Sequence, residues 1–226
     1  FDDATVAEAR ARCIAERGTI HAIVGENGAG KSTLLRMLTG NLAPSSGHIA
    51  VCGIDLLKHP QQAKRHLGYL PDIPPLYTEM TVDAYLLLVA RLHRMHETQL
   101  PRLLDDVKLR CGLSNQGARL IKTLSKGYQQ RLGIAQAIIH RPDVIILDEP
   151  TVGLDPNQMR EVRQLIRELA TTSSIVISTH ILYEVENICD RVQILHQGQT
   201  VFNQSMQQLR EQSIELDGVF TKLTQQ

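Results

Sequence analysis

The sequence of 226 residues contains no tryptophan, and aromatic residues make up only 4% of it. It also lacks a net charge, because its 24 Lys and Arg residues are balanced by 24 Asp and Glu residues. A chain without an excess of positive charge does not attract nucleic acid through a non-specific field. The composition therefore argues against a DNA- or RNA-binding protein.

Long apolar runs are absent as well. The longest, Leu86–Ala90, is far shorter than the roughly 20 apolar residues that a membrane-spanning helix needs. The chain shows no signal-peptide pattern, and it begins with Phe1 rather than Met, which is compatible with a few missing initial residues. Its length suits one well-buried α/β domain, or a domain with an inserted subdomain.

Cysteine is scarce, and no two cysteines form a Cys-x-x-Cys pair. Widely separated thiols are typical of a protein in a reducing compartment, where we expect them to serve as small core residues. The cysteines are Cys13, Cys52, Cys111 and Cys189.

The most informative stretch reads GENGAGKS, from Gly25 to Ser32, and matches the P-loop pattern of Gly, four residues, then Gly-Lys-Ser. Glycines let the backbone bend tightly and bring its N–H groups close to nucleotide phosphates. In this pattern Lys31 reaches the β- and γ-phosphates, and the Ser32 hydroxyl ligates Mg²⁺. The residues predicted to bind the nucleotide are Gly25, Asn27, Gly28, Ala29, Gly30, Lys31, Ser32 and Thr33.

The residues on either side of this loop agree with it. Ile20–Val24 is a short, mostly apolar run that predicts a buried strand. Thr33–Leu38 predicts a helix, whose N-terminus favours an anion. The alternative is a glycine-rich turn with a lysine placed by chance, and the succession of strand, loop and helix argues against it.

Polar residues follow each of three further predicted strands. In an open parallel α/β sheet, ligands bind outside the carboxyl ends of the strands. We therefore expect these polar residues to converge with the P-loop on one site. The runs are 67–70 before Asp72, 144–147 before Asp148 and Glu149, and 175–177 before His180.

Hydrolysis of a nucleoside triphosphate needs a metal ion, a positioned water and stabilised charge on the γ-phosphate. Asp148 follows an apolar strand and is the expected acidic partner of a Mg²⁺ ion bound to Ser32. Glu149 is next to it and is the expected general base toward the attacking water. The alternative interpretation of the two acids is a solvated turn.

A second helix start lies in Leu124–Arg131, which reads LSKGYQQR. Ser125 is a typical N-cap, Gly127 permits close approach, and apolar residues follow at helical spacing. Such a helix N-terminus is a second anion-binding device in the same chain. We hypothesise that it serves a nucleotide held by a partner subunit, and the alternative is an ordinary capped helix.

Together these stretches resemble the motifs of the nucleotide-binding subunit of ATP-binding cassette (ABC) transporters, over essentially the whole chain. GENGAGKS resembles the Walker A motif, LSKGYQQR the signature, VIILDEP the Walker B motif, TVGLDP the D-loop and STH the switch histidine loop, in the family's order. The resemblance implies that ATP and Mg²⁺ bind, and that Ser125 and Gly127 contact the γ-phosphate of the opposite subunit. It also implies that His180 contacts the γ-phosphate of its own subunit and that Asp155 communicates across the dimer.

Three departures from the family pattern affect specific residues. Lys126 and Tyr128 replace a glycine and a glutamine of the usual signature LSGGQ. Asp72 stands where the family has the Q-loop glutamine, so we include it among the expected metal-site residues, with its equivalence to glutamine left open. Phe1 lies about one residue from the position of the aromatic side chain that stacks on adenine, and it is a candidate for that role.

The predicted fold is α/β: a P-loop NTPase core with a mostly parallel sheet, a small antiparallel β subdomain and an inserted α-helical subdomain. Residues 1–226 are predicted to form a single ABC ATPase domain, with the helical insertion at approximately 73–140. His93 and His96 are interpreted as exposed helix residues rather than metal ligands. Further expected elements are strands over 7–16 and 48–51, a helix over 81–95, a helix capped by Asp155, and a hairpin of 192–195 with 200–202.

We predict an ATPase whose subunits close head to tail over two MgATP and drive a separate membrane-spanning permease. The pair is a homodimer or a heterodimer. The expected location is cytoplasmic, peripheral on the cytoplasmic face of the inner (plasma) membrane. The stretches GYLPDIPPLYTEMTV and LDGVFTKLT resemble the bacterial export-type branch, whereas GTIHAIVGENGAGKST also resembles sugar-import ATPases.

Two alternatives stay open for the function and one for the docking surface. The first alternative function is a soluble ABC-type ATPase that acts as an assembly or scaffold factor without a permease. The second is an ATPase that acts on nucleic acid, which the neutral charge disfavours. After Pro74-Pro75, the apolar residues Leu76, Tyr77 and Met80 either pack beneath the helical subdomain or line a cleft for a short helix of the membrane partner.

Overall fold

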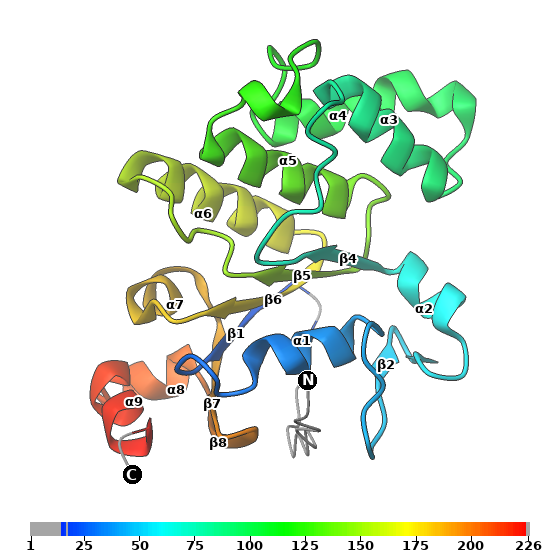
Figure 1. Ribbon diagram of the computed structural model, residues 1–226. Helices are drawn as coiled ribbons and strands as arrows, with labels where there is room; N and C mark the ends of the chain where they lie inside the picture. The colour runs from blue at the N-terminus through cyan, green and yellow to red at the C-terminus, as the bar shows by residue number, and fades with distance from the viewer. Residues whose placement is uncertain (1–14, 17, 225–226) are drawn as a thin grey trace, which may run out of the picture.

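A six-stranded sheet forms the centre of the computed structural model, which describes residues 15, 16 and 18–224 (Figure 1). The strand order is β4-β5-β6-β1-β7-β8, and every neighbouring pair is parallel except the antiparallel pair of β7 and β8. A separate two-stranded antiparallel sheet consists of β2 and β3. The strands are β1 Ile20–Val24, β2 Ala50–Val51, β3 Ile54–Asp55, β4 Leu67–Leu70, β5 Val144–Asp148, β6 Ser174–Thr179, β7 Arg191–His196 and β8 Gln199–Ser205.

Helices connect these strands, and the connection from β4 to β5 is the richest in helix. It contains α3, α4 and α5, which lie in the upper part of Figure 1. The α-helices are α1 Lys31–Leu38, α2 Pro60–Arg65, α3 Val82–Leu92, α4 Leu100–Arg110, α5 Lys126–Ile138, α6 Pro156–Ala170, α7 Leu182–Ile188, α8 Met206–Glu211 and α9 Leu216–Thr224, and 3₁₀ turns occur at Glu97–Gln99 and Ile121–Thr123.

The sheet is buried on both faces, as parallel strands require. In β1, Ile23 packs with Leu34 and Leu35 of α1, whereas Ala22 and Val24 belong to a larger apolar cluster on the other face. This alternation follows from the two-residue period of a strand. Figure 1 shows α1 on one side of the sheet and α5 and α6 on the other. The sheet therefore separates two layers of core.

Capping residues fix the starts of the helices that follow the motifs. The side chains of Thr81, Ser125 and Asp155 accept hydrogen bonds from backbone N–H groups in the first turns of α3, α5 and α6. Pro156 then occupies the first turn of α6, where its missing N–H costs no intrahelical hydrogen bond.

The predicted α/β fold is confirmed, and its deviations are local. The strand expected over 48–51 is shorter, because only Ala50–Val51 pairs, and it does so with Ile54–Asp55 across a two-residue turn. The helix expected over 81–95 ends at Leu92. The strand expected over 7–16 falls outside the described residues except for its last two positions, and Phe1 falls outside them entirely.

Two cysteines occupy the core as expected. Cys111 and Cys189 are buried, and burial raises the pKa of the Cys111 thiol to about 12 and raises that of Cys189 as well. The expectation is wrong for Cys52, which is exposed because it lies in the turn between β2 and β3. Cys13 falls outside the described residues. Among the described helices, none combines the length and the apolar character that crossing a membrane would require.

Two histidines stack where the helical layer meets the sheet. The rings of His93, which caps the C-terminus of α3, and His140, which follows α5, are 3.8 Å apart and nearly parallel. His140 Nε2 donates to the carbonyl of Leu67 at 3.1 Å, while its Nδ1 is buried without a partner among the described residues. Burial, with a smaller contribution from His93, lowers the pKa of His140 to about 4.

This pair predicts a pH-dependent stability. Because the folded state keeps His140 neutral, the unfolded chain binds more protons between the ordinary histidine pKa and the lowered one. The free energy of unfolding should therefore fall by up to about 3 kcal/mol as the pH decreases from about 6.5 to 4. Urea unfolding of His140→Gln, which retains a donor for Leu67, should show a weaker decrease than the wild type. Equal slopes would contradict the assignment.

Candidate functional site

The loop between β1 and α1 depends on glycine at three positions. Gly28 and Gly30 have φ of 84° and 100°, a left-handed region that glycine adopts without strain. A Cβ at Gly25 would lie 2.6 Å from the backbone oxygen of Leu195. The start of the loop therefore passes directly over the end of β7, where no side chain fits.

The rest of the loop is divided between residues that anchor it and residues that face outward. Ala29 is buried, and its carbonyl accepts a hydrogen bond of 2.9 Å from the amide of Gly198 in the β7–β8 turn. Asn27 and Ser32 are exposed, and Thr33 is half-buried. The hairpin thus holds the loop, while its polar side chains stay accessible to a ligand.

Lys31 begins α1 and folds back across the loop. Its ammonium donates to the carbonyl of Gly25 at 2.7 Å and to that of Glu26 at 3.2 Å, and the residue is only 7% exposed. The same nitrogen lies 4.0 Å from Oε1 of Glu149. Because an unpaired buried charge is costly, these partners hold the ammonium in one place. The loop therefore contains a fixed positive charge.

β5 ends in Asp148, a carboxylate that is only 4% exposed. The parallel register places it beside Ser178 of β6, whose hydroxyl donates to Oδ1 of Asp148. Sequence reasoning gave Ser178 no role of its own. The pairing of two parallel strand ends is the signal that could have identified it, since adjacent ends bring their side chains together.

Glu149 has φ of 47°, a left-handed conformation that is uncommon for a residue with a side chain. Its amide donates to the hydroxyl of Ser178 at 3.1 Å and to the carbonyl of the same residue at 3.2 Å. Both carboxylate oxygens lie 3.0 Å from Nδ1 of His180, which carries the proton because a carboxylate only accepts. The turn therefore aims the Glu149 carboxylate at His180 and Lys31.

Asp72 is exposed just beyond the carboxyl end of β4. Its electrostatic effect reaches Tyr69 in that strand. Burial raises the pKa of Tyr69, the carboxylates of Asp148 and Asp72 raise it further, and Arg36 of α1 opposes them. The predicted strand-end residues thus share one edge of the sheet, although Asp72 is the most peripheral of them.

The second predicted anion site begins α5, on the other face of the sheet from α1. Ser125 is exposed and accepts a hydrogen bond of 3.4 Å from the amide of Tyr128. A Cβ at Gly127 would lie 2.5 Å from the end of the Gln158 side chain, so the absence of a side chain at Gly127 leaves room for this glutamine of α6. The Lys126 side chain passes over Gly153, next to the helix cap formed by Asp155.

A buried carboxylate on α7 joins the segments around the site, and sequence reasoning missed it because it lies within an ordinary amphipathic helix. Glu184 is 1% exposed and accepts hydrogen bonds from the hydroxyls of Thr151 and Thr179. Nε of Arg163 on α6 lies 3.6 Å from Oε1 of Glu184. This network connects the segment after Glu149 with the segment before His180.

These residues fit a magnesium-bound nucleoside triphosphate. The loop offers backbone N–H groups at a helix N-terminus and the fixed charge of Lys31, which suit an anion. Ser32 and Asp148 supply oxygen ligands, the type that Mg²⁺ prefers. The fold and this loop together define the P-loop NTPase fold.

Comparison with known proteins identifies the family. The ABC transporter family model matches residues 10–152. The chain is 40% identical over 185 residues to the bacitracin transport ATP-binding protein BcrA of Bacillus licheniformis, covering 81% of this chain and 60% of BcrA. It is 36% identical over 209 residues to the ABC transporter ATP-binding protein NatA of Bacillus subtilis, covering 91% of this chain and 85% of NatA. The chain therefore belongs to the ABC transporter family.

A solved structure agrees with this assignment. The structure of an ATP-binding subunit of an ABC transporter superimposes with a TM-score of 0.83 at 31% identity, covering 93% of this chain and 90% of the other. The chain spans less than two thirds of the length of BcrA, so BcrA contains a substantial part that has no counterpart in these 226 residues.

The Glu184 network predicts a large effect on stability. Glu184→Ala removes the buried acceptor of two hydroxyls and leaves Arg163 without its carboxylate, which should lower the free energy of unfolding by about 3–5 kcal/mol. The matched control is Glu186→Ala, an exposed position on the same helix, which should change it by less than about 0.5 kcal/mol. Denaturant titration measures both, and equal losses would contradict a special role for Glu184.

Proposed function

We propose that this chain is the ATP-binding subunit of an ABC transporter and that it hydrolyses MgATP. The observation that carries the proposal is the placement of the Glu149 carboxylate beside the P-loop, 4.0 Å from Nζ of Lys31 and 3.0 Å from Nδ1 of His180. Beside a phosphate-binding loop, the fixed cation supplies charge stabilisation and the carboxylate supplies a base for the attacking water, two of the contributions that phosphoryl transfer to water needs.

Each group has a distinct role in this proposal. Lys31 neutralises charge on the β- and γ-phosphates, and a Mg²⁺ ion held by Ser32 and Asp148 supplies further neutralisation when bound. Glu149 accepts a proton from the attacking water, a function that typically contributes about 10²–10⁴-fold in rate. His180 orients that carboxylate through its Nδ1–H and, by the family resemblance, contacts the γ-phosphate.

The signature motif, in this proposal, acts on the nucleotide of a second ATPase subunit. Ser125 begins α5, which packs in the core layer opposite to the layer of α1. A nucleotide on the P-loop and the signature of the same chain therefore belong to different layers. A head-to-tail pair brings the exposed Ser125 of one chain to the phosphates held by the other, with Asp155 at the contact between the chains. The pair is homo- or heteromeric.

The catalytic and dimer assignments predict a specific pair of variants. Glu149→Gln keeps the side-chain shape but loses the base, so ATP should still bind while turnover falls by about 10²-fold or more. With ATP, the variant should accumulate as a dimer on size exclusion. Adding Ser125→Arg should abolish that dimer while leaving ATP binding by the monomer intact. Normal turnover in Glu149→Gln would contradict the base, and a dimer that survives Ser125→Arg would contradict the head-to-tail arrangement.

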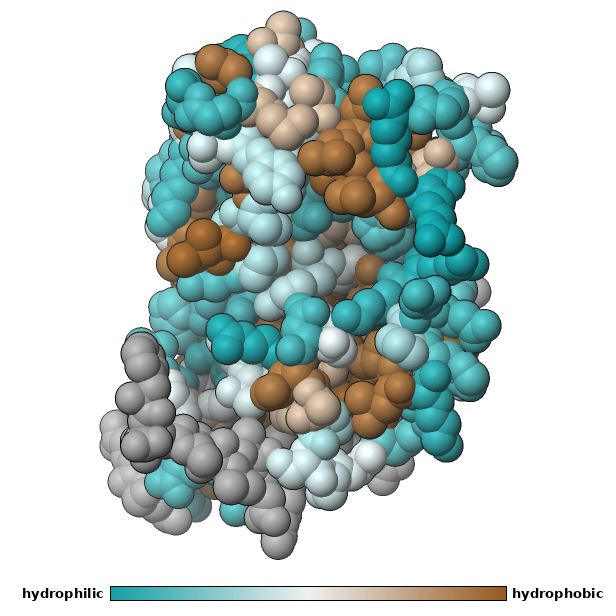
Figure 2. All heavy atoms as spheres, turned by 45° about the vertical axis from the view of Figure 1, so that its right-hand side comes forward, coloured by the Kyte–Doolittle hydropathy of each residue, from teal (hydrophilic) through white to brown (hydrophobic). Residues whose placement is uncertain are grey.

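A membrane-spanning permease is the proposed partner, which places the subunit at the cytoplasmic face of the inner membrane and, by its motif resemblance, in an exporter. The segment after β4 offers the contact. Leu76 and Met80 pack against the core, which agrees with the alternative that this segment packs beneath the helical subdomain. In contrast, Ile73 is 81% exposed and Tyr77 is 59% exposed. Figure 2 shows that, on the face it draws, apolar side chains gather in separate groups with hydrophilic side chains between them.

The docking proposal predicts that Ile73→Asp prevents capture of the partner. A charge that becomes buried at an apolar contact goes unpaired, so recovery of a membrane-spanning subunit with the tagged chain from detergent-solubilised membranes should fall by about tenfold or more. Leu92→Asp is the matched control, because Leu92 is 71% exposed on the neighbouring helix α3. Both variants should retain ATPase activity.

The outcome also separates the two classes of function. Undiminished recovery with Ile73→Asp would refute this docking surface. Failure of the wild-type chain to recover any membrane-spanning protein would favour the alternative, a soluble ABC-type ATPase that acts as an assembly factor. We further propose that residues 1–226 form one ABC ATPase domain, in which approximately 73–140, containing α3 to α5, form the inserted helical subdomain.

A further inference from the structure

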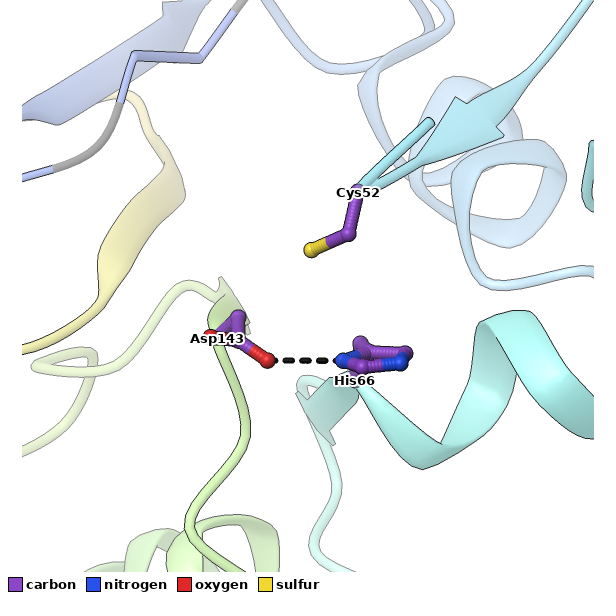
Figure 3. A group of neighbouring side chains, drawn as sticks. All are labelled: Cys52, His66 and Asp143. Carbon is purple, nitrogen blue, oxygen red and sulfur yellow. Dashed lines mark hydrogen bonds and ion pairs between the residues drawn. The ribbon is translucent and has the colours of Figure 1, made fainter. Parts of the chain in front are cut away.

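Three potential metal ligands from distant parts of the chain meet at the amino ends of β4 and β5. The candidate nucleotide site lies at the opposite, carboxyl ends of the strands. One donor atom each of Cys52, His66 and Asp143 lies within 4.8 Å of the other two. Nδ1 of His66 is 2.7 Å from Oδ2 of Asp143. Figure 3 shows both groups facing each other, with the sulfur of Cys52 above the space between them.

The backbone fixes this meeting. His66 and Asp143 directly precede β4 and β5, whose register pairs Leu67 with Val144. The amide of Val144 donates to the carbonyl of His66 at 2.9 Å. The hydrogen bonds between β4 and β5 therefore hold His66 and Asp143 side by side. Their side chains are 39% and 49% exposed, which leaves them accessible to an ion from solvent.

Cys52 reaches the same place from the two-stranded sheet. It lies with Gly53 in the turn between β2 and β3, and both residues have positive φ, 51° and 79°. Two successive positive φ values are typical of a tight hairpin turn, where Asn, Asp and Gly are the usual residues. A cysteine in this position accepts a less favourable backbone conformation. The turn directs its side chain toward the start of β5 (Figure 3).

We propose that Cys52, His66 and Asp143 bind a divalent transition-metal ion of the Zn²⁺ class, with water as the fourth ligand. A thiolate, an imidazole and a carboxylate together form a donor set typical of Zn²⁺, whereas Mg²⁺ takes oxygen ligands. Zn²⁺ holds such ligands at about 2.0–2.3 Å in a tetrahedral arrangement. The ion replaces the proton between His66 and Asp143, which move apart slightly as the Cys52 sulfur moves in.

Proton balance in this step is simple. The thiol of Cys52 releases its proton to solvent, the neutral imidazole of His66 carries its proton on Nε2, and Asp143 is already ionised. The ion would join the β2–β3 turn to the residues that precede β4 and β5. These two strands are already held together by their ladder and by the His66–Asp143 contact. The two-stranded sheet meets β5 through a small apolar cluster of Val51, Leu56 and Ala63, against which Val144 packs. The ion would therefore cross-link the two-stranded sheet to the six-stranded sheet.

The test uses the full chain without nucleotide, in a Cys13→Ser background that removes the thiol outside the described residues. Titration with Co²⁺ should give one ion per chain and a thiolate-to-cobalt charge-transfer absorption, which Zn²⁺ displaces. Cys52→Ser should abolish that absorption. His66→Gln and Asp143→Asn should each weaken Zn²⁺ binding by about tenfold or more. The control His59→Gln, which changes an exposed histidine that is not one of the three proposed ligands, should leave it unchanged.

Two further readouts keep the proposal falsifiable. Zn²⁺ should raise the melting temperature of the parent chain but not that of the three ligand variants. Without Zn²⁺ or Co²⁺, all three variants should show the parent's far-ultraviolet circular dichroism and, with MgATP, its ATPase activity. A large excess of Mg²⁺ should not displace the cobalt spectrum. Absence of the thiolate absorption, or equal Zn²⁺ affinity in all variants, would overturn the site and leave the proposed ATPase function untouched.

Discussion

The parallel pairing of β5, β6 and β1 is the constraint on which the candidate nucleotide site depends. Each of these strands ends at the same edge of the sheet, so the P-loop, the Asp148–Glu149 turn and the segment leading to His180 are neighbours because their strands are neighbours. The strands stay in register because both of their faces are covered by apolar side chains, and a slip of one residue would exchange the two layers of core. The geometry of the candidate site therefore depends on the apolar packing of the strands that lead to it.

At the carboxyl ends of these strands, Ser178 orients two residues of the neighbouring segment. Its hydroxyl donates to Asp148 and accepts from the amide of Glu149, so one residue of β6 fixes two consecutive residues of the neighbouring segment. The left-handed backbone of Glu149 has a conformational cost of about 1–3 kcal/mol, which the surrounding hydrogen bonds offset. Without that turn, the carboxylate would continue the alternation of β5 and would not meet both Lys31 and His180. The strained residue is also the one to which sequence reasoning assigns the general base, as expected where strain serves a function.

Much of this arrangement could be predicted from the sequence, and the failures have physical causes. GENGAGKS and the uninterrupted apolar run before Asp148 determine local structure, so they identified the loop, the strands and the polar strand ends correctly. Glu184 could not be found, because its partners Thr151 and Thr179 come from segments far away in sequence and a single carboxylate on a helix is usually solvated. Leu76 and Ile73 look alike in the sequence, and only the packing of the helical layer distinguishes the half-buried Leu76 from the exposed Ile73. Cys52 was expected in the core because burial is the usual state of a thiol, and the tight β2–β3 turn overrides that tendency.

The proposed metal site and the nucleotide site lie at opposite ends of β5, which limits how one can affect the other. Five residue steps separate Asp143 from Asp148, and at about 3.3 Å per residue the distance along the strand is about 16 Å. The Cys52 thiolate and the Asp143 carboxylate balance the two charges of the ion, and at this distance a change of one unit charge is worth only about 1 kcal/mol at an effective dielectric of about 20. β5 is a buried central strand that is paired on both sides, so we expect the ion to cause no displacement of the turn after Asp148 either. Its effect must be confined to the part of the structure that lacks a large core of its own, the two-stranded sheet. A sheet of only two strands is marginally stable. An ion that holds the β2–β3 turn against the starts of β4 and β5 would therefore stabilise the two-stranded sheet more than any other part of the structure.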